Sequence, residues 1–525
     1  MSASLFLRFA IVLIAGCAHA ASVAWPFSSG FSPGLPVWWL QLLALGLLAW
    51  ALNQSGTTWR QAFLLGWLFA VSWLTGTFWW LFISMHTYGG LAAPLAAMAV
   101  VGLAAFLALY YAAFCGAFSA LAIANKAWGA IIFAAFWLLA EMARGVWLTG
   151  FGWGAAGYAH VDGLLAGYAP WVGAYGLCFI SAWLAMTIPQ AFACGPWQRV
   201  AALLVLTLPS VAQMGANESD TAFSNSAGRL SVTLLQGNIP QDEKFQPGTG
   251  VVESLRWYGA QLQAANTDLV VSPETAIPLL PQQLPQGYWD ELKGAFQAPA
   301  GTGFKPAAII GIPLGSYEDG YTNSVIGLKG GQPAIYQYDK HHLVPFGEFI
   351  PPLFKWFTAM MNIPLGDFNR GAVGQPSFEV AGQRLAPNVC YEDLFGEELG
   401  ARFVNPVAAP TIFVNVSNIG WFGNTVAIDQ HLQISRMRAL EFERPFVRAT
   451  NTGATVIIDH RGVVTQSLPR HTKGVLTGEV EGRNGVTPFA WWISRLGLWP
   501  FWILGFGLVA TAALQQRRLA RISRA

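Results

Sequence analysis

The sequence predicts a polytopic α-helical membrane bundle of about eight spans that carries an α/β domain. Three observations lead to this fold class. Of the 525 residues, 54% are apolar and only 11% are charged, with 24 Trp and 35 Phe, a balance that is rare in soluble proteins. Several stretches are apolar over the roughly 20 residues that a helix needs to cross a bilayer. From about Arg229, the sequence changes to short β-branched and apolar runs that end in turn residues.

Eight apolar stretches are predicted to cross the membrane. They lie near residues 5–23, 36–53, 60–84, 91–123, 127–145, 164–190, 198–214 and 491–514. We therefore predict a bundle of about seven spans at 1–215, an α/β domain at 216–489, and a C-terminal span with a basic tail at 490–525. An alternative concerns the first span, because Cys17 ends a stretch that resembles a lipobox and Ala20 ends one that resembles a signal-peptidase site. Cleavage at either residue would leave seven spans.

The basic residues of the short loops predict the orientation, because Lys and Arg are enriched on the cytoplasmic side. They lie at alternate ends of the spans and in the tail, at Arg8, Arg60, Lys126, Arg199, Arg517, Arg518, Arg521 and Arg524. All of them fall on one side if both termini are cytoplasmic, which places the α/β domain in the periplasm. Arg144 departs from this pattern. It lies one turn from Glu141 near the outer end of a span, either as a structural pair or as a head-group contact.

The composition excludes several functions. A formal net charge of +2 gives no electrostatic support for a nucleic-acid partner. The sequence has no Cys or His spacing typical of zinc sites and no Gly-rich phosphate loop, so we expect neither a metal nor a cofactor. The spans hold few ionisable residues, which disfavours a transporter or a channel.

Short apolar runs alternate with helical patterns in the α/β domain, which predicts a layered fold. The predicted strands are 231–236, 268–272, 307–313, 323–328, 334–339, 385–390, 411–417 and 455–459. The clearest helical patterns are 251–266 and 426–442. The stretch 351–368 is too apolar for an exposed loop and too short to span a membrane. It is either a core helix or an arm at the bilayer surface.

Three predicted strands end in residues that can carry chemistry. Glu274 follows the apolar run 269–271, Lys340 follows 334–339, and Cys390 ends 385–390. The ends of buried strands are where α/β sheets place active sites. Acyl transfer at a thiol needs a carboxylate as general base and a cation that favours the thiolate and then the oxyanion. A buried cysteine that only fills space is the alternative for Cys390.

The motifs around these residues resemble those of a known family. Pro273-Glu274, Asp339-Lys340-His341 and Asn388-Val389-Cys390-Tyr391-Glu392 resemble the nitrilase (carbon–nitrogen hydrolase) superfamily, whose signature is a Glu–Lys–Cys triad on an α-β-β-α sandwich. Membrane spans on both sides of the domain narrow the resemblance to the apolipoprotein N-acyltransferases of Gram-negative inner membranes. Further matching segments are 141–145, 149–153, 157–158, 236–241, 344–348, 421–423, 438–441 and 448–453. Two positions depart from the family pattern: Ile419, where an acidic residue is usual, and Phe245, where Trp is frequent.

The resemblance implies a role for each matching residue. Cys390 is the nucleophile that takes an acyl chain from a phospholipid, phosphatidylethanolamine above all, as a thioester. Glu274 is the general base, and Lys340 stabilises the thiolate and the oxyanion. Glu348 and Glu392 orient Lys340, with an ordinary ion pair or a solvated carboxylate as the alternative. Tyr391 and Trp421 shape the acyl pocket or its mouth, with plain core packing as the alternative.

The resemblance also implies the partners and the location. The acceptor is the N-terminal amine of a diacylated apolipoprotein, and the transfer is the last step of lipoprotein maturation. The chain is expected to act as a monomer in the inner membrane. Two rival chemistries share these residues: a Cys–His dyad with His341 or His342, and a membrane-tethered amidase that sends water to the thioester. We expect His431 to bridge elements of the domain rather than to react.

Overall fold

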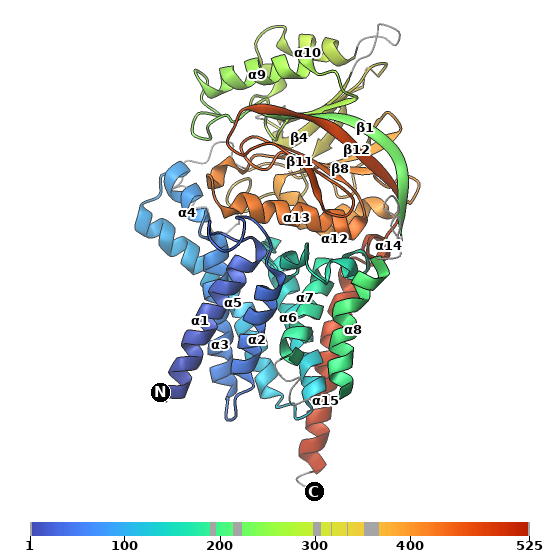
Figure 1. The fold of residues 1–525 in the computed structure, drawn as a ribbon. Helices are drawn as coiled ribbons and strands as arrows, with labels where there is room; N and C mark the ends of the chain where they lie inside the picture. The colour runs from blue at the N-terminus through green and yellow to red at the C-terminus, as the bar shows by residue number, and fades with distance from the viewer. Residues whose placement is uncertain are drawn as a thin grey trace. The chain divides into compact units, whose positions relative to one another are not determined.

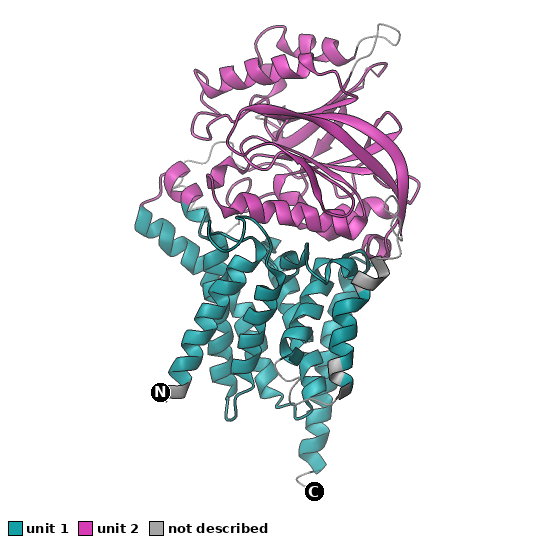
Figure 2. Cartoon of the chain, in the orientation of Figure 1, with its two compact units in different colours: residues 1–82, 93–216, 496–525 teal, residues 83–92, 217–495 magenta. Residues whose placement is uncertain are grey.

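The computed structural model describes residues 3–188, 196–213, 223–297, 306–316, 318–332, 334–350 and 367–522. The chain forms two compact units (Figure 2). One consists of residues 1–82, 93–216 and 496–525, and the other of residues 83–92 and 217–495. Of the stretch 351–368, which is predicted to be a core helix or an arm, residues 351–366 lie outside the described residues.

A helix overlaps each of the eight intervals that are predicted to span the membrane (Figure 1). These helices are α1 (Ala3–Val23), α2 (Trp38–Leu52), α3 (Trp59–Phe78), α5 (Ala93–Ala120), α6 (Lys126–Val146), α7 (Ala169–Thr187), α8 (Pro196–Gln213) and α15 (Trp499–Ile522). By length and composition, five described helices can cross a membrane, or six if α14 (Pro488–Leu496) and α15, which are bent by 86°, form one span. The predicted number of about eight spans is therefore not confirmed. Helix α2 has only 15 residues: Pro36 precedes its N-cap residue Val37, and Asn53 is its C-cap residue.

Glu141 and Arg144 of α6 form a structural pair inside the helical unit. Both side chains are fully buried, and Arg144 Nη2 donates to Glu141 Oε2 at 2.8 Å. Tyr111 joins the pair, since its hydroxyl accepts from Arg144 Nε and donates to Glu141. Arg144 Nη1 donates to the carbonyls of Phe151 and Trp153. A guanidinium that is paired in this way stays in the protein interior, which explains why Arg144 departs from the charge pattern of the loops.

Two six-stranded sheets are the centre of the second unit, as far as its residues are described (Figure 1). The first has the order β12-β1-β2-β3-β4-β5, with β1 (Ser224–Gln236), β2 (Leu269–Val271), β3 (Ala307–Ser316), β4 (Gly320–Leu328), β5 (Tyr336–Asp339) and β12 (Gly474–Gly485). The second has the order β11-β10-β9-β8-β7-β6, with β6 (Phe378–Val380), β7 (Gln383–Val389), β8 (Ile412–Ser417), β9 (Phe446–Thr450), β10 (Val456–Ile458) and β11 (Val464–Ser467). Strands β1, β2 and β3 are parallel, and so are β7, β8 and β9. Parallel neighbours end at the same edge of a sheet, where loops can gather side chains.

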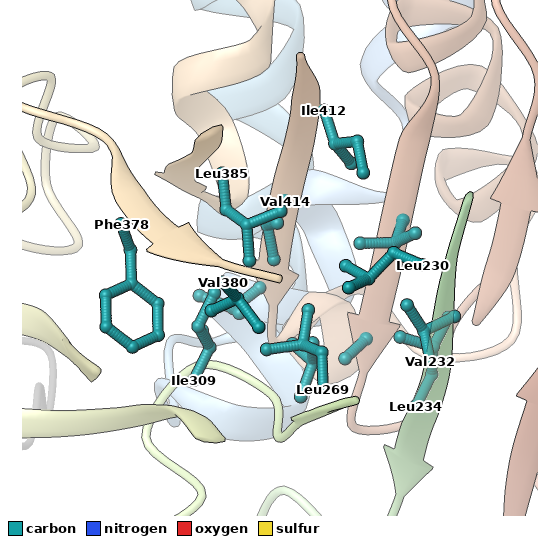
Figure 3. Close-up of a cluster of buried hydrophobic side chains, with 14 of the residues drawn as sticks. Leu230, Val232, Leu234, Leu269, Ile309, Phe378, Val380, Leu385, Ile412 and Val414 are labelled. Carbon is teal, nitrogen blue, oxygen red and sulfur yellow. The ribbon is translucent and has the colours of Figure 1, made fainter. Parts of the chain in front are cut away.

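The central strands are buried on both faces. Successive side chains of a strand point to opposite faces, so Val232 and Leu234 of β1 enter the core between the sheets (Figure 3). Leu235 instead packs in the core formed with α9 (Gly250–Ala264) and α10 (Tyr288–Phe296). On the second sheet, Phe413 of β8 contacts Phe442 of α13 (Val426–Phe442). The layers are therefore helices, sheet, sheet and helices, the α-β-β-α sandwich that the resemblance implies.

Candidate active site

The three predicted catalytic residues lie at the ends of strands from both sheets. Glu274 comes three residues after β2, while Lys340 directly follows β5 and Cys390 directly follows β7. Lys340 Nζ lies 3.3 Å from Glu274 Oε1. The charges of both residues act on the pKa of the Cys390 thiol. The fold therefore brings a carboxylate, an ammonium and a thiol from three distant parts of the chain to one place.

Hydrogen bonds fix both carboxylate oxygens of Glu274. Asn323 Nδ2 donates to Oε1 at 2.7 Å, and the backbone N–H of Asn418 donates to Oε2 at 2.8 Å. Burial alone would raise the pKa of Glu274, but Lys340, Asn323, Lys244 and Asn418 together lower it below its usual range. The carboxylate is therefore ionised at neutral pH, the form in which it can accept a proton.

The backbone of Glu274 is held from two sides. A Cβ atom at Gly311 of β3 would lie 2.2 Å from the carbonyl oxygen of Pro273, so only glycine allows this close approach. Lys244 lies in the turn after β1, and its Nζ donates to the carbonyl of Glu274 at 3.0 Å. The Lys244 side chain is almost fully buried, and burial lowers its pKa to about 7. The base is thus positioned by its main chain as well as by its carboxylate.

Two carboxylates share the ammonium group of Lys340. Its Nζ lies 2.8 Å from Glu348 Oε1 and 3.3 Å from Glu274 Oε1. Burial opposes the charged form, but the two carboxylates hold the pKa of Lys340 above its usual value. Glu348 is fixed in turn, since its Oε2 accepts from the backbone N–H of Val344 at 2.8 Å. Lys340 is therefore a permanent cation with a defined orientation.

Glu392 binds the ends of β5 and β7 rather than Lys340. Its Oε2 accepts from the backbone N–H of Val389 at 2.7 Å and from the Tyr338 hydroxyl at 2.8 Å. Its Oε1 accepts from the backbone N–H groups of His341 at 2.6 Å and His342 at 3.2 Å. The described contacts include no hydrogen bond between Glu392 and Lys340, in contrast to the predicted role. Glu392 orients the backbone that carries Lys340, and the charges of the two residues also interact.

Cys390 occupies a sharp turn between β7 and a short 3₁₀ helix (Cys390–Leu394). Its φ is 51°, a left-handed conformation that few residues other than glycine adopt. Its carbonyl accepts from Asn415 Nδ2 at 3.1 Å, and its sulfur accepts from the Ser417 hydroxyl at 3.1 Å. Burial and the charge of Glu274 raise the pKa of the thiol to about 12, despite the opposite effects of Lys340 and Ser417. The resting residue is therefore a thiol.

His341, His342 and His431 bind partners other than the sulfur within the described structure. His341 Nδ1 lies 2.7 Å from the carbonyl of Gly371, and His342 Nδ1 lies 2.8 Å from Glu398 Oε1. These contacts direct both rings elsewhere and disfavour the Cys–His dyad. His431 of α13 lies 2.9 Å from Asp393 Oδ1 and 3.2 Å from the carbonyl of Cys390. It bridges the helix layer and the nucleophile turn, as we expected.

Tyr391 and Trp421 lie in aromatic surroundings. Tyr391 is buried and meets the ring of Phe395 edge-on at 5.2 Å. Trp421 is half-buried and meets the ring of Tyr88 edge-on at 5.9 Å. The described contacts fit core packing as well as a pocket wall, so the acyl-pocket role of both residues stays a prediction.

Four polar residues of the site were missed by the sequence analysis: Lys244, Asn323, Ser417 and Asn418. Ser417 is the last residue of β8 and Asn418 follows it, so the strand-end argument would have found both. Asn323 lies inside β4, and Lys244 lies in a turn, where the sequence offers no comparable signal. Within the described ranges, no group of three or more His, Cys, Asp and Glu side chains could hold a metal ion.

The chain matches known proteins along most of its length. The family model "Apolipoprotein N-acyltransferase N-terminal domain" matches residues 21–187, and "Carbon-nitrogen hydrolase" matches residues 231–486. The apolipoprotein N-acyltransferase of Verminephrobacter eiseniae (strain EF01-2) is 56% identical over 512 residues, which cover 93% of this chain and 92% of the relative. That of Ralstonia nicotianae (strain ATCC BAA-1114 / GMI1000) is 45% identical over 488 residues, which cover 92% and 90%. The crystal structure of a carbon-nitrogen hydrolase from Helicobacter pylori G27 is 15% identical, with a TM-score of 0.35, over 53% of this chain and 94% of that one. This chain belongs to the apolipoprotein N-acyltransferase family.

Proposed function

We propose that this chain transfers an acyl chain from a phospholipid, through a thioester on Cys390, to the N-terminal diacylglyceryl-cysteine amine of apolipoproteins. The observation that carries the proposal is the convergence of Glu274, Lys340 and Cys390 at strand ends in a member of this family. An ionised carboxylate, a permanent cation and a thiol are the groups that a two-step acyl transfer requires. The most suitable donor is phosphatidylethanolamine.

The first half-reaction forms the thioester. Proton transfer from the thiol to Glu274 is unfavourable in the resting site, because the pKa of Cys390 is about 12 and that of Glu274 lies below its usual range. The proton therefore leaves as the bond between sulfur and the ester carbon forms, while negative charge moves to the carbonyl oxygen. Lys340 stabilises that oxyanion. The ester C–O bond then breaks, and the leaving glycerol oxygen takes the proton from Glu274.

The second half-reaction uses the same groups in the reverse sense. The acceptor amine attacks the thioester carbon and gives a proton to Glu274. Lys340 again stabilises the oxyanion, the C–S bond breaks, and the sulfur leaves and regains a proton. Glu348 keeps Lys340 in place, and Glu392 maintains the spacing of the strand ends that carry Lys340 and Cys390. We assign the wall of the acyl pocket to Tyr391 and Trp421.

The helical unit suits substrates that are anchored by lipid chains. Exposing an acyl chain to water costs about 0.8 kcal/mol per CH₂, so the transfer is best carried out at a membrane surface. We assign the chain to the inner membrane, with domain 216–489 in the periplasm and both termini in the cytoplasm, from the distribution of Lys and Arg. We also propose that it acts as a monomer, since one chain supplies all the site residues named above.

The test is the intact mass of the purified protein after incubation with phosphatidylethanolamine, beside Cys390→Ala. We expect a gain of one acyl chain on the parent protein, removed by neutral hydroxylamine and absent from the variant. A diacylated lipopeptide added next should take the acyl chain faster than water does. Release to water alone would favour the amidase-type hydrolase. No acyl gain in folded protein with intact lipid would overturn the phospholipid-donor mechanism.

A further inference from the structure

Ser417 touches the atom on which the proposed reaction depends. It is the last residue of β8, its side chain is fully buried, and its Oγ donates to Cys390 Sγ at 3.1 Å. Its backbone is fixed on the opposite side, since the carbonyl of Ser417 accepts from the N–H of Asn451 at 3.1 Å. The hydroxyl that contacts the sulfur is thus carried by the last residue of a sheet strand.

We propose that Ser417 is a catalytic residue of the acyl transfer, because its hydroxyl stabilises the Cys390 sulfur whenever that atom carries negative charge. This inference rests on the proposed function. Negative charge develops on the sulfur twice in each cycle, as its proton leaves during attack on the ester and as it departs from the thioester. Ser417 keeps its own proton throughout. In both halves the sulfur's proton passes to or from Glu274, and the bonds that form and break are those at the acyl carbon.

The electrostatics of the site explain why a neutral donor is needed. Among the cations that interact with Cys390, which include Lys244 and Arg448, Lys340 lowers the pKa of the thiol most, but Glu274 and Glu348 already share its charge. Glu274 itself opposes a second negative charge nearby, and burial does the same. A hydroxyl can stabilise the thiolate without adding a further buried charge that would need a counter-ion. Ser417 is placed to do this at every pH at which the enzyme works.

Asn418, the residue after Ser417, contacts the base Glu274. Asn418 donates its backbone N–H to Glu274 Oε2 at 2.8 Å, while Ser417 donates its hydroxyl to Cys390 Sγ. Two consecutive residues at the end of β8 therefore bind the base and the nucleophile. If Ser417 is only structural, its substitution should lower the stability of the protein. If it is catalytic, its substitution should lower the reactivity of the sulfur, and the two effects can be measured separately.

The experiment compares Ser417→Ala, Ser417→Thr and the parent protein, each as the full chain in detergent. The rate of alkylation of Cys390 by iodoacetamide is followed from pH 7 to 9.5 by peptide mass spectrometry, which separates Cys390 from the exposed Cys17. Ser254→Ala is the matched control, because Ser254 is buried in α9 and its hydroxyl makes no hydrogen bond within the described structure. The thermal midpoint Tm of each variant reports folding.

We expect Ser417→Ala to alkylate about tenfold more slowly at every pH, since a hydrogen bond to a charged group is lost. Ser417→Thr, which keeps a hydroxyl, should recover most of the rate, and Ser254→Ala should match the parent. Thioester formation from phosphatidylethanolamine should slow by a similar factor in Ser417→Ala. Equal alkylation rates in folded Ser417→Ala and the parent would overturn the inference. Slower alkylation without acylation of the parent would instead overturn the proposed function and leave the Ser417–sulfur interaction standing.

Discussion

Replacing Glu392 by glutamine should loosen the connection between the two sheets at the active site. The Glu392 carboxylate accepts four hydrogen bonds, two from the backbone after β5, one from Tyr338 of β5 and one from the backbone of Val389 in β7. Burial raises the pKa of this carboxyl, but four donors require an acceptor on each oxygen. A glutamine amide accepts hydrogen bonds only on its oxygen. Its NH₂ group would therefore point at groups that are themselves donors.

The structure sets the size of the effect. In the better orientation, the NH₂ group takes the place of Oε2, where the Tyr338 hydroxyl can rotate to accept but the N–H of Val389 cannot. One buried N–H is then left unsatisfied, which costs about 1–3 kcal/mol, and bonds to a charged acceptor become weaker bonds to a neutral one. We expect a total loss of about 2–4 kcal/mol. For a domain of this size, that lowers Tm by about 4–8 °C.

Thermal unfolding in detergent, followed by tryptophan fluorescence, measures the loss. Tyr338→Phe removes one of the four donors without leaving a backbone group unsatisfied, so its Tm should fall by only about 2 °C. Glu479→Gln is the matched control, because Glu479 pairs with Arg229 at the surface and exposed pairs contribute at most about 1 kcal/mol. If Glu392→Gln unfolds at the same temperature as Glu479→Gln, the carboxylate does not hold the sheets together.

Three further substitutions test the groups around Glu274. Lys244→Met should raise Tm relative to the parent, and most at pH 6–7. The pKa of Lys244 is about 7 in the folded protein and 10.5 in the unfolded chain. Burial of the charged lysine therefore destabilises the parent fully below pH 7 and progressively less as the pH rises to 10.5. Gly311→Ala should slow thioester formation at least tenfold and lower the stability by about 1–3 kcal/mol, because its Cβ would displace Pro273 and Glu274. Lys340→Met should lower the free energy of unfolding by about 3–5 kcal/mol, because two buried carboxylates lose their shared ammonium partner. The double variant with Glu348→Gln should regain part of the Tm but not the acylation rate.

Each stretch that the sequence predicts as a strand overlaps a strand of the structure, from the fully buried β8 to the more polar β5. The stretches 268–272, 307–313 and 411–417 correspond to β2, β3 and β8, and the helical pattern 426–442 coincides with α13. Strand β9 was missed because Arg448 interrupts its apolar run. The structure compensates this buried guanidinium with Asp393 at 3.2 Å, a partner 55 residues away in the sequence. Strand β12 was missed because its glycines and glutamates are disfavoured in strands, and only pairing with β1 makes it one.

The candidate site could be predicted to the extent that strand ends define it. Glu274, Lys340 and Cys390 each follow an apolar run, so their convergence could be expected from the sequence. The contacts of Glu392 could not be predicted. A carboxylate two residues from the proposed nucleophile suggests an ion pair with Lys340, whereas the fold directs it to backbone N–H groups. Lys244 could not be predicted either, because a lysine in a turn is usually exposed and only the tertiary fold buries it.

Sheet register at the end of β8 helps to set the positions of both the base and the nucleophile. Strand β8 pairs in parallel with β7, which leads directly to Cys390, and the pairing places Val416 opposite Val389. The next residue of β8, Ser417, binds the sulfur, and Asn418 binds Glu274. A displacement of the end of β8 would therefore move the contacts to both catalytic groups together. A register error in β8 would turn its side chains to the opposite faces and remove Ser417 from the sulfur. The reactive geometry is thus stabilised by the same backbone hydrogen bonds that form the second sheet.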